Sequence, residues 1–306
     1  MRFDPLYISS AVSALDQASA LEQQITNQMS SGKRINSLGD DPVAIGQNVL
    51  LSAQLNMDDS FSRTESSAAG MLQVADSTLG SVVSQLTQAL SKATAANNGT
   101  LNASDLKSLA AQLAGIRDEV LSLANTTYMG QYIFSGSQGS TAPYTLNPGT
   151  TPAADTVTYN GDNVVSHITT PSGQQIQLNV PGIQIFGDST TASSQSVLQA
   201  LNQLIADFSS GTVASTSATD TTTLNTVLNY VSQQRVTLDN SITQLQSAQT
   251  YVQNQGTQIT AVQTNLLQTD MALASTQLSL AETQQAALTQ VVSLLEQNNG
   301  SLFKLM

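Results

Sequence analysis

The stretch 224–294, LNTVLNYVSQQRVTLDNSITQLQSAQTYVQNQGTQITAVQTNLLQTDMALASTQLSLAETQQAALTQVVSL, decides the fold of this 306-residue chain. Counted in sevens, its positions are apolar without exception: Leu224, Val231, Leu238, Leu245, Val252, Ile259, Leu266, Leu273, Leu280, Ala287 and Leu294. Such a repeat is typical of a helix that supercoils left-handedly with a partner, and no proline follows Pro181 to interrupt one. The repeat predicts a single helix of roughly 105 Å at 1.5 Å per residue.

The second seam of this helix is mostly polar. Four residues after the repeat positions stand side chains such as Arg235, Gln249 and Asp270, where a stable dimeric coiled coil has apolar ones. The apolar stripe is therefore one residue wide. Because ordering each residue costs about 1–2 kcal/mol, so narrow a stripe leaves the isolated helix marginal. We expect partner helices, either from elsewhere in this chain or from neighbouring subunits.

Composition and charge exclude several classes of protein. Nine Lys and Arg stand against 21 Asp and Glu, and the net charge of −12 repels nucleic-acid phosphates and anionic lipids. We therefore expect neither nucleic acid nor a membrane as a partner. The chain has no cysteine, which excludes disulfides and thiolate metal sites, and no apolar run reaches the 18 residues of a membrane span. Polar residues from Asp4 to Asp16 break up any signal-peptide core, so export would use a route without cleavage.

Helical spacing extends through the first part of the chain. Asp4-Pro5 predicts the start of a helix of about 25 residues that ends near Ser31-Gly32. Asp41-Pro42 repeats this start and predicts a second helix, which Asn97-Asn98-Gly99 ends. A third helix is predicted with Ser104 as its N-cap, and it can pair antiparallel with the second across a short loop.

The loop 33–42 between the first two helices carries a basic pair and an acidic pair. Its charges favour a solvated loop whose side chains cap helices and pair with neighbours. A functional site in the loop is the alternative.

A β-rich segment follows Gly136 and extends to Gly187, where five of the seven prolines lie. The strand 156–159 leads into Asn160-Gly161, the strongest two-residue hairpin signal, and is predicted to pair with 164–169. Another turn at 171–173 leads into a strand over 174–180. We predict a small β meander.

Helical spacing resumes at 197–208, and a Ser/Thr-rich linker, 209–219, precedes the long helix, for which Asp220 or Thr221 is the predicted cap. The predicted fold class is mainly α with a small β insert (α+β). Its long terminal helices form an antiparallel coiled-coil bundle.

The residues that catalysis needs are not clustered in the sequence. His167 is the single histidine and stands in a predicted strand, so a catalytic triad or a histidine metal site has one candidate and no cluster. The acidic pairs 40–41, 58–59 and 118–119 are adjacent in sequence, and neighbours on a helix point about 100° apart. No phosphate-binding, dinucleotide or calcium loop motif occurs. We therefore expect no enzyme, with no catalytic, cofactor-binding or metal-binding residues.

Three motifs resemble the bacterial flagellin superfamily. SSGKRIN at 30–36, followed by DDPVA at 40–44, resembles its N-terminal signature. Asn125-Thr126 leading to GQYIFSG at 130–136 is similar to the end of the helical core in the superfamily's hook–filament junction proteins. The outer β domain of those proteins has motifs similar to YNGD at 159–162, NVPG at 179–182 and Phe186. Gln131 stands where a basic residue is common, and the tail LFKLM at 302–306 lacks the aromatic residue expected after Leu-Phe.

The resemblance implies a flagellin-like fold and a structural role in the flagellum. Terminal helices of this kind would be largely unstructured in the free subunit and form concentric helical tubes on assembly. The implied role is an adaptor between hook and filament, needed for filament attachment and swimming, exported by the type III apparatus to the extracellular hook–filament junction. The implied partners are hook-associated protein 1, flagellin, further copies of the chain in a ring, and a cytoplasmic export chaperone that holds the C-terminal helix.

The resemblance and the apolar stripes together suggest where partners bind. The expected interface residues are Ile8, Val12, Leu15, Ile25, Met29, Lys33, Arg34, Asn36, Asp40, Asp41, Val252, Ile259, Leu266, Leu273, Leu280 and Leu294. The expected domains are 1–42, an N-terminal assembly helix of the inner core; 43–136, a helical core; 137–190, a β-rich outer domain; 191–219, a helix and linker; and 220–306, a long coiled-coil helix with an assembly segment.

Two other functions fit the same patterns. A short flagellin would polymerise with copies of itself into a filament. A secreted coiled-coil adhesin would use the β insert as its binding module, although the polar second seam disfavours a stable coiled-coil oligomer.

Overall fold

The structure, a computed structural model, describes residues 5–188 and 196–303, and the side chains of 9–188 and 196–294. The chain divides into two compact units. Unit 1 consists of residues 1–56 and 254–306, the two ends of the chain, and unit 2 consists of residues 57–253.

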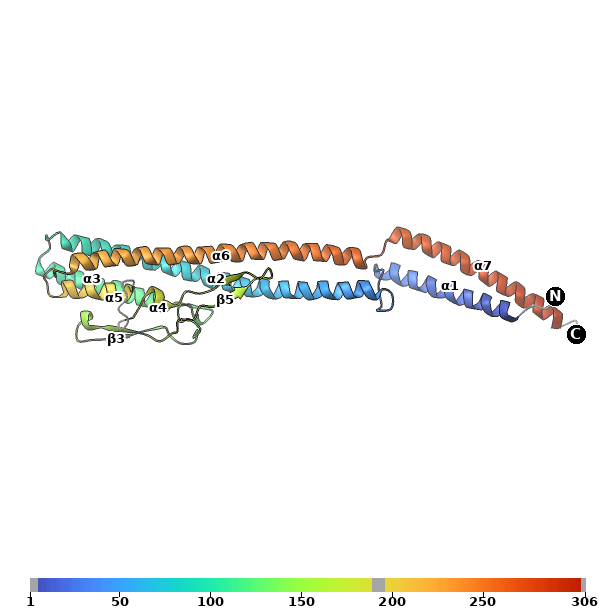
Figure 1. Cartoon of the computed structure of the whole chain (residues 1–306), viewed down its shortest axis with the longest axis horizontal. Coiled ribbons are helices and arrows are strands. Elements are labelled where there is room, and N and C mark those ends of the chain that lie inside the picture. The colour runs from blue at the N-terminus through green and yellow to red at the C-terminus, as the bar shows by residue number, and fades with distance from the viewer. Residues whose placement is uncertain (1–4, 189–195, 304–306) are drawn as a thin grey trace. The chain divides into compact units, whose positions relative to one another are not determined.

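Helices carry most of the described chain (Figure 1). They are α1 (Pro5–Ser31), α2 (Pro42–Asn97), α3 (Ala103–Ala124), the short α4 (Gly182–Ile185), α5 (Val197–Ser209), α6 (Ser217–Leu267) and α7 (Met271–Phe303). The predicted class, mainly α with a small β insert, is confirmed. The bounds of α1 match the prediction, although Asp4, its predicted cap, lies outside the described residues.

Side-chain caps fix where the helices begin. Asp41 accepts a hydrogen bond from the Ala44 amide at 3.0 Å and starts α2, as predicted. The predicted cap of α3 is wrong, because Asn102 rather than Ser104 holds that position. Asn102 accepts from the Ser104 and Asp105 amides, and Asp105 bonds back to the Asn102 amide, which completes a capping box.

The core of unit 2 contains side chains from α2, α3, α5 and α6, among them Leu79, Leu113 and Leu201. The first five positions of the heptad repeat, from Leu224 to Val252, are buried in this core. Polar pairs show that α2 and α6 are antiparallel: the Arg235 guanidinium binds the Asp76 carboxylate at 2.8 Å, and Ser62 bonds Gln249. In unit 2 the long repeat therefore has partner helices within its own chain.

The start of α6 differs from the prediction, since the helix begins at Ser217 and not beside Asp220 or Thr221. The buried Ser217 hydroxyl donates to Asn97 Oδ1 at 2.7 Å, and Asn97 Nδ2 donates to the Thr221 hydroxyl at 3.0 Å. These bonds to the end of α2 hold an extra turn of helix that the Ser/Thr-rich composition did not predict.

The predicted single helix over 224–294 is wrong. It is broken at residues 268–270 into α6 and α7. The Asp270 carboxylate accepts from the Ala272 and Leu273 amides at 2.9 and 3.1 Å, so it caps the start of α7. A new helix therefore begins inside the uninterrupted heptad repeat.

The described β structure is three separate two-stranded antiparallel sheets. They pair β1 (Thr127–Tyr128) with β2 (Gln131–Tyr132), β3 (Tyr144–Asn147) with β4 (Thr156–Tyr159), and β5 (His167–Thr169) with β6 (Gln175–Gln177); a short 3-10 helix, η1 (Pro152–Ala154), precedes β4. The turn predicted at 171–173 is confirmed as the β5–β6 connection. The prediction of a continuous β meander is wrong.

The predicted hairpin at Asn160-Gly161 does not form, because long-range bonds take the chain elsewhere. The Asn160 amide donates to the Pro143 carbonyl at 2.7 Å, and the Asp162 amide donates to the Ser135 carbonyl at 3.1 Å. Gly161 also lacks the positive φ that the expected turn requires. The strand 156–159 therefore pairs with β3 and not with 164–169.

The β insert is tied to the helices by Arg117 of α3, which is fully buried. Its guanidinium donates to the Pro152 carbonyl, to Asn202 Oδ1 of α5 and to Asp155 Oδ2, at 2.7–3.1 Å. The buried cation is compensated by the Asp155 carboxylate, which also accepts from the Gly149 amide.

The corner between α5 and α6 predicts a pH-dependent stability. Burial of Asp207, helped by the neighbouring Asp220 carboxyl, raises the pKa of Asp207 to about 6, against the opposing effect of the Thr216 hydroxyl bond. A raised carboxyl pKa contributes stability at low pH, and this contribution is lost as the pH rises through about 6. We expect Asp207→Asn to stabilise unit 2 by about 1 kcal/mol at pH 7.

Urea unfolding followed by circular dichroism measures this difference at pH 7 and pH 4. The advantage of Asp207→Asn should disappear at pH 4, where the wild-type carboxyl is also neutral. Asp59→Asn, at an exposed position of α2, is the matched control and should show no such change. Equal stabilisation by Asp207→Asn at both pH values would contradict the assignment.

Candidate assembly interface

In unit 1, α1 and α7 lie side by side and antiparallel (Figure 1). The core between them is thin: Ala18, Ile25, Ala274 and Ala281 are buried, and Met29 and Leu278 are half-buried. Three of the four buried side chains are alanines, which bury little apolar surface. The two helices therefore gain little stability from one another.

Unit 1 exposes more apolar side chains than it buries. Of the eighteen large apolar side chains that are exposed among the described residues, twelve lie in this smaller unit: Val12, Leu21, Leu38, Val43, Val49, Leu50, Val262, Met271, Leu273, Leu280, Val291 and Leu294. Scattered exposed apolar residues are normal, but their concentration on one unit makes unit 1 the candidate interaction surface.

The interface residues predicted on α1 have different environments. Ile25 is buried, Leu15 and Met29 are half-buried, and Val12 is exposed. The side chain of Ile8 lies outside the described residues. The predicted stripe of α1 is thus covered in part by α7 and open at Val12.

The interface residues predicted on the C-terminal repeat are buried or half-buried before the helix break and exposed after it. Val252 and Ile259 are buried and Leu266 is half-buried, whereas Leu273, Leu280 and Leu294 are 56%, 60% and 53% exposed. In α7 the residues that face α1 come one position later: Ala274, Ala281 and the half-buried Leu288.

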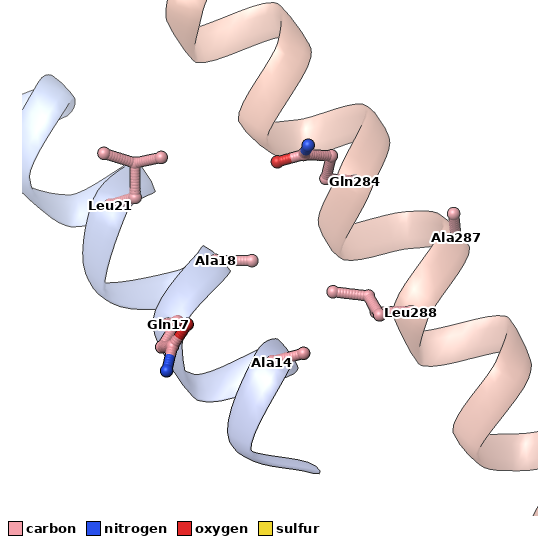
Figure 2. Close-up of a pocket in the computed structure, with 7 residues that line it drawn as sticks. All are labelled: Ala14, Gln17, Ala18, Leu21, Gln284, Ala287 and Leu288. Carbon is pink, nitrogen blue, oxygen red and sulfur yellow. The ribbon is translucent and has the colours of Figure 1, made fainter. Parts of the chain in front are cut away.

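A hollow lies between α1 and α7, and Figure 2 shows the side chains around it. Ala14, Gln17, Ala18 and Leu21 line it from α1, and Gln284, Ala287 and Leu288 line it from α7. Ala18 and Leu288 point toward each other in this view, while small side chains leave the rest open. The surface of the α1–α7 helix pair is thus indented at Ala14, Ala18 and Ala287.

The break after α6 is held by a short main-chain bridge to the loop after α1. Lys33 and Gln268 form an antiparallel bridge, the Arg34 amide donates to the Leu267 carbonyl at 2.7 Å, and the Thr269 amide donates to the Gly32 carbonyl at 3.1 Å. We name residues 32–34 and 267–269 the cross-bridge. It fixes the ends of α1 and α6 to each other.

The charged side chains of the loop support the cross-bridge from within unit 1. Arg34 Nη2 donates to the Leu266 carbonyl and to the Asp41 carboxylate, both at 3.2 Å. The carboxylate of Asp40 accepts from the Asn36 and Ser37 amides at 2.8 Å. The Asn36 amide bond, followed by those from Ser37, lowers the pKa of Asp40; the Ala44 amide and Arg34 lower that of Asp41. The predicted capping and pairing are confirmed, while an interface role of Lys33, Arg34, Asn36, Asp40 and Asp41 stays a prediction.

Neither the cross-bridge nor the capping role of Asp270 is predicted by the heptad periodicity. A local signal for the cap exists, because Thr269-Asp270 before an apolar helical segment is a typical helix start. The heptad repeat continues through it and concealed it. Main-chain pairing between residues so far apart in sequence has no periodic signature.

Within the described residues, no group of three or more His, Asp or Glu side chains is placed to hold a metal ion. In the same part of the chain, no helix combines the length and the apolar character that crossing a membrane requires.

The terminal helices and their exposed stripes are those of a flagellin-like assembly protein, and the comparison with family models agrees. Residues 7–139 match the bacterial flagellin N-terminal helical region. The chain is 30% identical over 230 residues to flagellar hook-associated protein 3 of Escherichia coli K12, which covers 72% of the chain and 73% of that protein. It is 35% identical over 134 residues to flagellar hook-associated protein 3 of Salmonella typhimurium LT2, covering 44% and 42% of the two.

The chain therefore belongs to the flagellar hook-associated protein 3 family. It is a structural protein of the bacterial flagellum, which lies outside the cell. The fold is similar to that of the flagellar junction protein FlgL from Legionella pneumophila, with a TM-score of 0.56 at 16% identity, over 73% of this chain and 100% of that one.

Two glycines in the loop allow a matched test of the cross-bridge. Gly32 has a φ of +69°, where a β-branched side chain is strained. Gly39 has no such φ, and an added Cβ would make only an ordinary contact with the Ser37 hydroxyl, at 3.9 Å. We expect Gly32→Val to weaken the cross-bridge, since left-handed backbone costs an L-residue about 1–2 kcal/mol. In the source bacterium it should reduce the fraction of cells with attached filaments, counted by electron microscopy.

Gly39→Val is the control and should leave that fraction near the wild-type value. Equal effects of the two substitutions would show that the conformation of Gly32 does not matter for assembly.

Proposed function

We propose that this chain is the adaptor that joins the hook to the flagellin filament and is needed for filament attachment and swimming. The observation that carries this proposal is the concentration of exposed apolar side chains on unit 1, together with its thin core. A surface of this kind is stable only when other helices cover it. The names of the relatives, hook-associated protein 3 and flagellar junction protein, support a position of the chain between the hook and the filament.

The proposed axial partners are hook-associated protein 1 on one side, flagellin on the other, and further copies of the chain in a ring. The exposed apolar residues occur on several elements, such as Val12 of α1, Leu50 of α2 and Leu280 of α7. Neighbours in more than one direction are required to cover all three. In this arrangement 1–42 and the distal part of 220–306 are the assembly segments, 43–136 is the core, 137–190 is the outer domain, and 191–219 connects them.

We further propose a cytoplasmic export chaperone as an earlier partner. Before export, the exposed leucines of α7 would promote nonspecific association, and the helix would be accessible to proteases. We therefore expect a cytoplasmic protein to cover these leucines. Export through the type III apparatus without cleavage then delivers the chain to the hook–filament junction. Zero cysteines suit passage as an unfolded chain.

The proposed role is mechanical and uses no catalysis or cofactor. It is supported by the structural role of the family and by the exposed position of His167, the single histidine, on β5 opposite Gln177.

Deleting the gene from its bacterium tests the adaptor proposal. We expect hooks without filaments, flagellin released into the medium, and loss of swimming, all restored by the intact gene. Normal filaments on the deletion strain would contradict the proposal.

Seeded growth separates this function from the two alternatives. Purified chain added to filament seeds should not extend them without limit, whereas a short flagellin would. Hooks that keep their filaments in the deletion strain, with loss of surface adhesion instead, would favour the adhesin.

The chaperone proposal predicts the effect of a triple substitution. Leu266→Ser, Leu273→Ser and Leu280→Ser together remove the apolar contacts that α7 and the end of α6 offer, so chaperone pull-down and export should both be lost. The control replaces the exposed Gln277, Thr283 and Gln290 of α7 by Ser and should keep both. Unchanged pull-down with the leucine variant would place the chaperone site elsewhere.

A further inference from the structure

Two parallel apolar stripes run along α7. The inner stripe consists of Ala274, Ala281 and Leu288, and it faces α1. The outer stripe consists of Leu273, Leu280 and Leu294, each one residue before the corresponding heptad position of the inner register, and all three are more than half exposed. Leucines thus lie on the open side, whereas two of the three inner-stripe residues are alanines.

The break between α6 and α7 sets this arrangement. In the α6 part of unit 1, Ile259 is buried and Leu266 is half-buried, and the uninterrupted repeat continues to Leu273 and Leu280. A straight helix would keep these residues on the side buried in α6. Across residues 268–270 the buried positions instead move by one residue, and the cross-bridge and the Asp270 cap hold the break in place.

We propose that this break is a positioning device: it directs the inner stripe of α7 to α1 and holds the outer stripe outward, where it docks into the α1–α7 hollow of a second copy of the chain. The proposal rests on the adaptor function, because it names which residues copies use to contact each other.

The shapes of the two surfaces support the pairing. The hollow is lined by the small side chains of Ala14 and Ala18 on α1 and Ala287 on α7, among larger neighbours such as Leu21 and Leu288 (Figure 2). At the heptad position between Leu280 and Leu294 stands the smaller Ala287, which borders the hollow. Leucine side chains on one copy and an indentation on the other are the complementary parts of knobs-into-holes packing.

The size of the contact favours further copies of the chain in a ring over an isolated dimer. A stripe one residue wide is far smaller than the roughly 800 Å² per partner of a stable pair of proteins. The exposed Leu273 and Leu280 come before the hollow along α7, whose lining residues there are Gln284, Ala287 and Leu288. The contact between two copies is therefore head-to-tail, and rotation can close it into a ring. The described side chains of α1 and α7 carry only three charges, Asp16, Glu22 and Glu282, so little repulsion opposes contact between copies.

Cysteine cross-linking tests the proposal on flagella purified from the source bacterium, because the natural chain has no cysteine. Ile25→Cys with Ala281→Cys should cross-link within one chain. Ile25→Cys with Leu280→Cys, shifted by one residue, should give at least tenfold less of that product. Ala14→Cys with Leu280→Cys should give a ladder of multiples of the chain.

A second variant tests the device itself. Replacing both Thr269 and Asp270 by Ala removes the cap and favours a straight helix; it should reduce the ladder at least tenfold and lower the number of attached filaments.

Three results would overturn the proposal. The first is absence of the ladder although the chain with Ala14→Cys and Leu280→Cys is incorporated. The second is a cross-link within the chain that forms as efficiently with Ile25→Cys and Leu280→Cys as with Ile25→Cys and Ala281→Cys. The third is a product with a different flagellar protein only. Absence of the unsubstituted chain from purified flagella would instead overturn the adaptor function.

Discussion

An apolar stripe one residue wide cannot order a long helix unless other helices cover it, and the structure depends on how this constraint is met. In unit 2 the stripe from Leu224 to Val252 is covered by side chains of α2 and by the helices that pack with it. In unit 1 the cover is incomplete, because α1 offers α7 a contact built mainly from alanines. The first part of the repeat thus stabilises a core, whereas Leu273, Leu280 and Leu294 beyond the break remain exposed.

Polar contacts join the N-terminal part of the chain to the C-terminal part and fix how their helices align. Arg235 and Asp76 fix α6 against α2 within unit 2, and the cross-bridge joins the α1–α2 loop to the break within unit 1. Each of these contacts links residues from the first and the last third of the chain. Ordering one terminus therefore requires the other, which suits a protein whose ends order together during assembly.

The helices, their order and the mainly α class follow from periodicity and caps, which are local properties of the sequence. The errors fall where distant residues decide the structure. Asn160-Gly161 has the local signal of a hairpin, but the Pro143 and Ser135 carbonyls redirect it. The repeat from Leu224 to Leu294 predicts one helix and a single buried stripe, but the cross-bridge divides it and leaves Leu273 and Leu280 exposed. An apolar repeat shows that a helix has a contact face, and only the packing shows which partner each residue faces.

Amide hydrogen exchange on the verified monomer tests the central claim, that unit 1 needs neighbouring subunits to be ordered. We expect fast exchange throughout α1 and α7 in the monomer, with slow exchange in the parts of α2 and α6 that belong to unit 2. The same amides of α1 and α7 should become protected in purified flagella. Slow exchange of both terminal helices in the monomer would contradict the account, since α1 and α7 would then be stable without any neighbour.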